Sequence, residues 1–302
     1  MSYGQTYGGL LTAMTQALAK ADVYSSWPAD EVQHQTRAEA EQMLAHVTGW
    51  SRLQLLQHFS DNVPGHILKQ LQQYTEERAG GKPLAYILGH TDFYGRVFQT
   101  RPGCLIPRPD TETVADHTIR WITVHRPSAK VVDIGTGTGC IAITVALECP
   151  DAHVTAVDVA DDAVQLANAN ARLLEATNVA VVQRDGFEWL HDAETFDKVN
   201  VIVSNPPYIP AGEKDLLEVS VKSYEPHLAL FAGEDGLSFY RRFAKLTEEV
   251  FLEGPAALFL EVGMGQARDV VQLFRAEPQW ADFSVQVYND LRGVERVVAL
   301  MR

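Results

Sequence analysis

The stretch Val131-Val132-Asp133-Ile134-Gly135-Thr136-Gly137-Thr138-Gly139-Cys140 decides the fold of this 302-residue chain. A short apolar run that leads into alternating glycines predicts a buried strand ending in a tight turn, and the apolar residues from Ile141 to Glu148 predict a helix behind it. Glycines let the backbone approach a ligand closely, and a helix N-terminus attracts negative charge. The sequence therefore predicts a nucleotide-type ligand at Gly135, Thr136, Gly137, Thr138 and Gly139.

Two common nucleotide sites fit this loop poorly. The dinucleotide fingerprint needs Gly-x-Gly-x-x-Gly, whereas the residue three positions after Gly137 is Cys140. The lysine of a phosphate-binding loop is also missing from the stretch. We therefore expect a ligand with an adenosine group and no phosphate grip.

Acidic residues follow the next two predicted strands. Asp158 lies about 20 residues beyond the glycines, where a carboxylate accepts both ribose hydroxyls. Asp185 ends the following strand and precedes Gly186 and Phe187, so we expect it to accept from the base amino group, with Phe187 or its backbone against the ring. A single Asp at such a place could be a helix cap, but the ordered series favours a ligand site.

The part of the chain after Pro127 alternates strand and helix patterns. This alternation predicts an α/β fold with a mainly parallel sheet covered on both faces. The last two strands are joined by a short turn that contains Asp290 and Gly293, so one of them should run antiparallel. The expected strands lie near Lys130–Ile134, Val154–Val159, Val179–Arg184, Val199–Ser204, Ala257–Val262, Ser284–Tyr288 and Arg296–Leu300.

The first third of the chain predicts a small helical bundle. Apolar residues from Leu10 to Leu18 have helical spacing, and a second helix is expected to begin near Thr36 and Glu39, which stand in capping-box positions, and to end before Gly49. Ser51 and Pro64 open two further segments. From Leu84 to Phe98 the aromatic and β-branched pattern predicts a hairpin that links two domains.

The tetrapeptide Asn205-Pro206-Pro207-Tyr208 follows a buried strand and predicts a site for an –NH2 group. Each proline holds the residue before it extended, so the Asn205 side-chain oxygen and the Pro206 carbonyl can both accept from one planar nitrogen. The Tyr208 ring supplies an apolar wall. The alternative is a proline-rich loop whose Asn caps a turn. Beside an adenosine site, an amine pocket favours S-adenosyl-L-methionine, with S-adenosyl-L-homocysteine as product, and methyl transfer by alignment.

Composition excludes several classes of protein. No apolar run reaches the roughly 18 residues of a membrane helix, and residues 1–5 lack a signal-peptide pattern, so we expect a cytoplasmic protein. The three cysteines have no metal-ligand spacing, and we expect neither a disulfide nor a metal. The net charge of −14 opposes docking on nucleic acid and suits a basic protein partner, although an acidic excess can also serve solubility alone.

Several blocks of the chain resemble the HemK/PrmC family of peptide chain release factor N5-glutamine methyltransferases. The match runs from about Arg37 to the C-terminus. Amino-directed DNA and RNA methyltransferases share the tetrapeptide, whereas the Leu-Ile-Pro-Arg-Pro and Tyr-Glu-Pro blocks are far more specific. The resemblance rests on Gly81–Gly89, Leu105–Glu112, Asp133–Gly139, Val203–Ile209, Tyr224–Pro226 and Gly233–Leu237.

The resemblance implies a class I (Rossmann-like) S-adenosylmethionine-dependent methyltransferase with a seven-stranded sheet. It implies a helical substrate-docking domain at 1–82, a β-hairpin linker at 83–104 and a methyltransferase domain at 105–302. The expected reaction is N5-methylation of the glutamine in the Gly-Gly-Gln loop of class I release factors, by a cytoplasmic monomer that binds no nucleic acid directly. Catalytic roles fall on Asn205, Pro206 and Tyr208, substrate binding on Asn205 to Tyr208, and cofactor binding on Gly135 to Gly139, Asp158, Asp185, Gly186, Phe187 and Asn205.

Three points stay open at this stage. Family members often place an aromatic ring directly after the acidic residue of the third strand, whereas here Gly186 precedes Phe187, so either residue could contact adenine. Arg108 could reach a ligand, but physical reasoning favours a solvated side chain. The competing functions are methylation of exocyclic amines in nucleic acid, methylation of a ribosomal-protein glutamine, and cofactor binding without catalysis.

Overall fold

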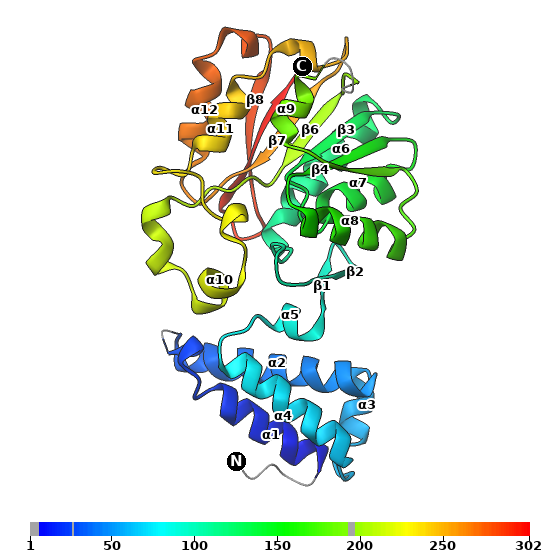
Figure 1. Cartoon of the computed structure of the whole chain (residues 1–302), viewed down its shortest axis with the longest axis vertical. Coiled ribbons are helices and arrows are strands. Elements are labelled where there is room, and N and C mark those ends of the chain that lie inside the picture. Colours follow the sequence, from blue (N-terminus) through cyan, green and yellow to red (C-terminus); the bar gives the residue numbers. More distant parts are fainter. Residues whose placement is uncertain (1–5, 26, 193–196) are drawn as a thin grey trace. The chain divides into compact units, whose positions relative to one another are not determined.

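The computed structural model describes residues 6–25, 27–192 and 197–302, which form two compact units. The first unit contains the described residues up to Gly89 together with 217–224, and the second contains the rest. Helices build the first unit (Figure 1): α1 (Tyr7–Leu18), α2 (Ala29–Thr48), α3 (Arg52–Gln57), α4 (Gly65–Ala79), α5 (Leu84–Leu88) and α10 (Val219–Tyr224), with a 3-10 turn η1 (Asp22–Tyr24).

Local signals at the helix ends explain most of this unit. Thr6 caps α1 by accepting from the Gly9 N–H, and Gly49 ends α2 in the left-handed conformation, as expected. Ser51 and Gln54 form a capping box at the start of α3. The helices enclose a core that includes Leu10, Met14, Met43, Leu44 and Leu71. The expected helical N-terminal domain is thus confirmed.

The expected start of the second helix was wrong. Pro28 stands before the first turn of α2, so Thr36 lies inside the helix, where its hydroxyl donates to the Val32 carbonyl over 2.7 Å. Glu39 is 3% exposed and bonds to Arg78 and Tyr24 instead of capping a backbone N–H. A Thr-x-x-Glu pattern is compatible with a capping box at the start of a helix and with a position inside a helix. Only the long-range partner of the Glu distinguishes the two.

The hairpin is shorter than the sequence suggested. Residues 84–88 form α5 because Pro83 precedes its first turn and Gly89, at φ +77°, ends it. The hairpin consists of β1 (His90–Phe93) and β2 (Arg96–Gln99), paired antiparallel. Phe93 and Phe98 are buried in the core of the second unit, so the hairpin is an integral part of that unit.

A seven-stranded sheet organises the second unit, in the order β5-β4-β3-β6-β7-β9-β8. Strand β9 is antiparallel to both of its neighbours, and the other pairs are parallel, which confirms the mainly parallel sheet. The strands are β3 (Lys130–Ile134), β4 (His153–Asp158), β5 (Val179–Gln183), β6 (Val201–Ser204), β7 (Ala257–Glu261), β8 (Ser284–Asn289) and β9 (Glu295–Met301).

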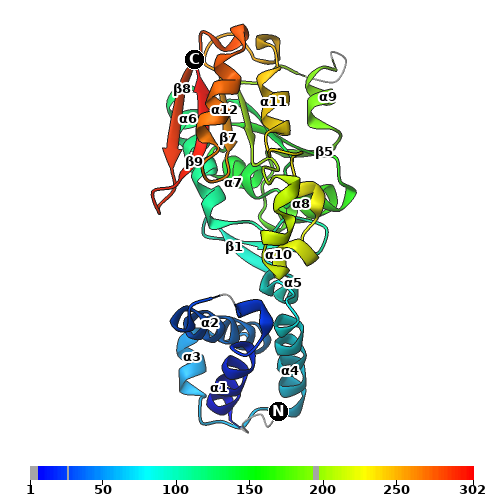
Figure 2. The ribbon, with the colours of Figure 1, turned by 90° about the vertical axis from the view of Figure 1, so that its left-hand side faces the viewer.

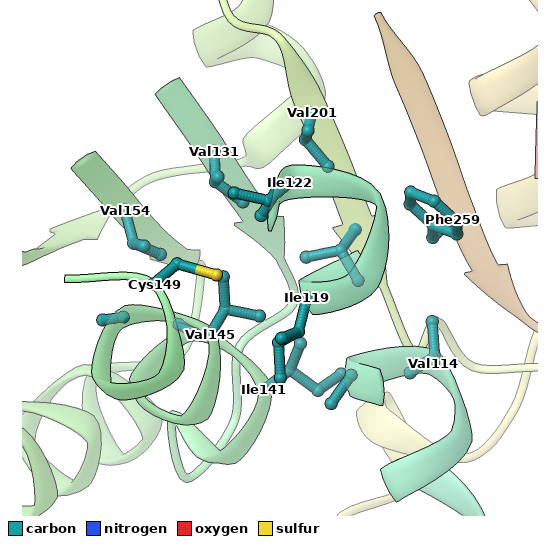
Figure 3. Close-up of a cluster of buried hydrophobic side chains, with 14 of the residues drawn as sticks. Val114, Ile119, Ile122, Val131, Ile141, Val145, Cys149, Val154, Val201 and Phe259 are labelled. Carbon is teal, nitrogen blue, oxygen red and sulfur yellow. The ribbon is translucent and has the colours of Figure 1, made fainter. Parts of the chain in front are cut away.

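Helices cover both faces of the sheet (Figures 1 and 2). Alternate residues of each strand point to opposite faces, so Val131 packs in one core and Val132 in the other. On the first face, side chains of α6 and α7 pack on β3, β4, β6 and β7 (Figure 3). The helices of this face are α6 (Glu112–His125), α7 (Cys140–Glu148) and α8 (Asp161–Leu173), and those of the other are α9 (Gly186–Leu190), α11 (Ser238–Ala244) and α12 (Ala267–Arg275).

Short 3-10 turns join several of these elements, and one of them, η2, leads into α6. They are η2 (Pro109–Thr111), η3 (Ala211–Leu216), η4 (His227–Ala229), η5 (Glu248–Val250) and η6 (Pro278–Trp280). Within the described part of the chain, no helix is both long and apolar enough to cross a membrane.

Candidate active site

The glycine loop joins β3 to α7 and is held in place by the carboxylate of Asp158. Gly135 and Gly137 have φ values of +75° and +56°, which only glycine adopts readily. The Asp158 carboxylate, at the end of β4, accepts from the N–H groups of Gly137 and Ala160, each over 2.9 Å. The neighbouring strands β3 and β4 thus bring the loop and this carboxylate together at the carboxyl edge of the sheet.

A cavity of about 390 Å³ opens at this edge of the sheet. Its volume lies in the range of small-molecule sites. Most of the residues proposed from the sequence line it: Gly135 to Thr138, Asp158, Asp185 to Phe187, Asn205 and Pro207. Residues from four strand ends therefore surround one space.

Three proposed site residues do not line this cavity. A Cβ on Gly139 would come within 2.8 Å of the Ile143 side chain and 3.2 Å of Ala167, so this glycine allows close packing of α7 and α8. Pro206 is buried. The Tyr208 carbonyl accepts from Gln266 over 2.9 Å, and burial raises the pKa of the Tyr208 hydroxyl to about 12.

The Asn205 side chain has a defined orientation. Its amide nitrogen donates to the Thr111 hydroxyl over 3.0 Å, and Asn205 also lines the cavity. Since one end of the amide is turned to Thr111, the oxygen is directed elsewhere. The bond to Thr111 thus leaves the side-chain oxygen of a cavity-lining residue available as an acceptor.

Asp185 makes contacts that the sequence did not predict. Its carboxylate accepts from the N–H groups of Phe187 and Glu188 and pairs with Arg242 over 2.9 Å. The Arg242 bond and the two backbone bonds outweigh desolvation and lower the pKa of Asp185. It is thus a helix cap as well as a cavity residue, which is the alternative that a lone Asp at a strand end leaves open.

The packing around Gly186 explains why no aromatic residue stands directly after Asp185. A Cβ on Gly186 would lie 2.7 Å from the Ile134 side chain, which leaves no space for a ring. The Phe187 ring packs against Phe243, 4.7 Å between ring centres, and Arg242 lies over it. Both Gly186 and Phe187 line the cavity.

The sequence analysis did not predict an ion pair at the cavity. Arg108 lines the cavity and bonds to Glu225, whose side chain is 1% exposed and also accepts from the Ile106 N–H over 3.3 Å. The Arg108 side chain is 39% exposed, so it is solvated in part, as expected, and it also reaches the cavity. Arg108 and Glu225 lie 117 residues apart, each in one of the two blocks that carried the family resemblance. Their places in those two blocks were the sequence signal for a contact between them.

Among the residues that the structure describes, no group of three or more His, Cys, Asp or Glu side chains is arranged to hold a metal ion. Cys104, Cys140 and Cys149 are buried and take part in no disulfide within the described residues, and burial raises the pKa of each thiol.

Comparisons with known proteins match both units. Residues 10–89 match the family model of the PrmC N-terminal domain, and residues 118–223 match the methyltransferase small domain. The release factor glutamine methyltransferase of Bacillus cereus is 37% identical over 276 residues, which cover 90% of this chain and 95% of that protein. That of Koribacter versatilis is 41% identical over 228 residues, which cover 73% of this chain and 75% of that protein.

One solved structure supports the fold alone. The hMettl16 catalytic domain, solved in complex with the MAT2A 3′UTR hairpin 6, has 15% identity and a TM-score of 0.51. The match covers 78% of this chain and 81% of that one.

The sheet, the glycine loop and the domain matches define a class I methyltransferase that uses S-adenosylmethionine. The sequence identity to the two relatives over most of the chain defines the family within that class. This chain belongs to the family of release factor glutamine methyltransferases.

Proposed function

We propose that this protein transfers the methyl group of S-adenosyl-L-methionine to the side-chain amide nitrogen (N5) of the glutamine in the Gly-Gly-Gln loop of class I peptide chain release factors. One observation supports the reaction above all others. Asn205, an amide acceptor, lines the same cavity as the glycine loop and Asp158. An amide nitrogen and an adenosine-bearing methyl donor would therefore meet at one wall of one site.

The cavity suits the cofactor. A Cβ on Gly135 or Gly137 would meet nothing within 4 Å, so the loop leaves open space beside its backbone. The Asp158 carboxylate is fixed by two backbone N–H groups and keeps lone pairs for the ribose hydroxyls. Asp185, Gly186 and Phe187 would hold the adenine end. When bound, S-adenosylmethionine supplies an electrophilic methyl group.

The protein has to orient a weak nucleophile. An amide nitrogen shares its lone pair with the carbonyl, so acceptors on both of its hydrogens raise its electron density and fix its direction. The Asn205 side-chain oxygen and the Pro206 carbonyl would accept those hydrogens, while Pro207 and Tyr208 border the glutamine. The nitrogen releases one proton to solvent after it has gained the methyl group. Alignment of this kind contributes up to roughly 7–11 kcal/mol in model systems.

The helical unit would dock the release factor in this proposal. Its helices carry none of the residues assigned to the reaction, and its match to the PrmC N-terminal domain supports a shared role in the family. The acidic excess lies in residues 111–302, with 29 Asp and Glu against 16 Lys and Arg, so the methyltransferase part suits a basic protein surface better than a phosphate backbone. The enzyme would act as a cytoplasmic monomer.

A transfer assay tests the reaction. Purified enzyme and radiolabelled S-adenosylmethionine are offered wild-type release factor, a variant factor with Gln→Ala in the Gly-Gly-Gln loop, ribosomal proteins, DNA and RNA in parallel. We expect label on the wild-type factor alone. Label on nucleic acid or on a ribosomal protein, with none on the factor, would replace the proposed substrate.

A further inference from the structure

Thr111 connects Asn205 to a buried carboxyl group. Thr111 ends η2 just before α6 and is 2% exposed, and its hydroxyl oxygen accepts from the Asn205 amide nitrogen over 3.0 Å. On its other side the hydroxyl makes a side-chain hydrogen bond with Glu261. Three residues that are far apart in the sequence thus form a single chain of hydrogen bonds.

The sheet brings two of these residues together. Ser204 at the end of β6 pairs with Leu260 on β7, so the next residues, Asn205 and Glu261, leave neighbouring strands at the same edge. Glu261 is 1% exposed, and its Oε2 has no hydrogen-bond partner among the described residues. Burial of a carboxyl group at the end of a core strand costs folding free energy and therefore needs an explanation.

Two guanidinium groups near Glu261 act towards its ionised form, which burial disfavours. The Arg296 guanidinium and, more weakly, that of Arg108 act against the desolvation that raises the pKa of Glu261 to about 7. Asp110 acts in the opposite direction. An ionised carboxylate only accepts hydrogen bonds.

The number of available hydrogens decides which group donates in each of these hydrogen bonds. A hydroxyl has one hydrogen, and above about pH 7, where Glu261 is ionised, Thr111 has to give it to the carboxylate. The Thr111 oxygen is then left as an acceptor, and only the NH2 end of the Asn205 amide can satisfy it. The two ends of an Asn amide have nearly the same shape, so packing alone would not select between them.

We infer that Thr111 and Glu261 are positioning residues that fix the Asn205 amide so that its oxygen, and not its NH2 group, faces the substrate amide. This inference rests on the proposed function, because it assigns the acceptor that the glutamine nitrogen requires. In the flipped orientation two NH2 groups would meet, and the substrate would lose one of its two acceptors. Glu261 acts only through Thr111, which itself lines the cavity.

Four variants test the inference in the full-length enzyme. Thr111→Val removes the hydroxyl at nearly constant shape, Thr111→Ser keeps it, and Glu261→Gln turns an acceptor into a group that can also donate. Thr118→Val is the matched control, because Thr118 is also buried in this region and its hydroxyl bonds to the Val114 carbonyl within α6. For each variant we would measure kcat and KM with release factor, cofactor affinity by calorimetry, and Tm.

We expect Thr111→Val to lower kcat roughly tenfold, which corresponds to ~1.4 kcal/mol in the barrier. Glu261→Gln should lower kcat about three- to tenfold without lowering Tm, since it removes a buried charge. Thr111→Ser and Thr118→Val should keep the wild-type kcat, and cofactor affinity should stay within about twofold in all four variants. Because the two residues act in series, the double variant should be no slower than Thr111→Val alone.

Several results would overturn the inference while the proposed function stood. They are a wild-type kcat for Glu261→Gln, a kcat loss in Thr111→Ser equal to that in Thr111→Val, or additive losses in the double variant. If Thr111→Val fails to fold, the kcat values of Glu261→Gln and Thr111→Ser still test the inference. Failure of the wild-type enzyme to label the release factor would instead reject the proposed function itself.

Discussion

The guanidinium carbon of Arg242 lies 4.0 Å from the centre of the Phe187 ring, so a charged group covers the ring that was expected to border adenine. The same guanidinium pairs with both oxygens of Asp185. Arg242 itself lines the cavity. It therefore connects the two residues to which adenine recognition was assigned, and we expect it to belong to the cofactor site.

Replacing Arg242 should weaken cofactor binding more than it weakens folding. The Arg242 and Asp185 side chains are 44% and 32% exposed, and an ion pair in such a setting contributes little to stability. We expect Arg242→Ala to raise the Kd for S-adenosylmethionine about three- to tenfold in calorimetry, because Asp185 and the Phe187 ring both lose their partner. Arg241→Ala is the control, since Arg241 pairs with Asp235 away from the cavity lining. Equal Kd values for the two variants would limit Arg242 to a surface role.

Asn205 should matter for turnover far more than for cofactor affinity. Asn205→Ala removes the acceptor proposed for the glutamine hydrogens, and we expect kcat to fall by about 100-fold or more, in line with losses of single oxyanion-hole donors. The Kd for S-adenosylmethionine should change only a few-fold. Asn168→Ala serves as control, because Asn168 bonds to a backbone carbonyl within α8. Unchanged turnover in Asn205→Ala would reject the mechanism.

The opposite pattern is expected for Asp158. Its two oxygens accept from the N–H groups of Gly137 and Ala160, and Asp158→Asn turns one of those acceptors into a donor that faces an N–H. We expect the Kd for S-adenosylmethionine to rise roughly tenfold or more, with kcat at saturating cofactor reduced much less. Asp162→Asn, at an exposed position of α8, should bind as the wild type does. A Kd in Asp158→Asn that matches this control would remove Asp158 from the cofactor site.

Local signals were sufficient to predict most of the fold. Strands buried on both faces read as short apolar runs, and helix ends carry glycines, prolines and capping residues, so β3 was predicted with its observed bounds and the antiparallel end of the sheet was anticipated. The sequence did not reveal that residues 217–224 belong to the compact unit of the N-terminal helices. The Tyr224 hydroxyl bonds to the Gly80 carbonyl over 3.2 Å, and no periodicity encodes a contact between such distant positions.

The candidate site, like the fold, was predicted from the sequence only in part. The positions of Gly135, Asp158 and Asn205 at strand ends follow from sequence order alone, because carboxyl ends of parallel strands share one edge. The partners of these groups do not follow from it. Thr111 behind Asn205, Arg242 on Asp185 and Glu225 on Arg108 come from other elements, and only the folded chain brings them into contact.

The buried Asp133 carboxyl should make stability depend on pH. Burial raises the pKa of Asp133 to about 7, although the Thr136 hydroxyl donates to it over 2.7 Å. A carboxyl whose pKa is higher in the folded state stabilises that state fully below its unfolded pKa of roughly 4, and this stabilisation is lost as pH rises through about 7. Asp133→Asn cannot ionise, so it should gain stability relative to the wild type as pH rises.

Urea unfolding of both proteins at pH 5.5 and pH 8 tests this expectation. The wild type should lose stability relative to Asp133→Asn between the two values, by up to about 1.4 kcal/mol per pKa unit. Glu261 is present in both proteins and has a similarly raised pKa, so the difference between them isolates Asp133. Parallel changes in the two proteins would show that Asp133 has no such shift.

Glu39 should be a main determinant of stability in the helical unit. It is 3% exposed and accepts from Arg78 over 2.8 Å and from the Tyr24 hydroxyl. Glu39→Ala would leave the buried Arg78 charge without its carboxylate, and removal of one partner of a buried pair typically costs about 3–5 kcal/mol.

Hydrogen exchange in the full-length protein would locate that loss. In Glu39→Ala, the amides of α2 and α4 should exchange faster by about two to four powers of ten, whereas those of β3 should keep their protection because they belong to the other compact unit. Glu41→Ala provides the comparison in the same helix, since the partners of Glu41, Arg37 and Arg52, are exposed and such pairs contribute at most about 1 kcal/mol. If the two variants exchanged alike, the contact between Glu39 and Arg78 would contribute no more than a surface ion pair, and the stability of the unit would have to come from its apolar core alone.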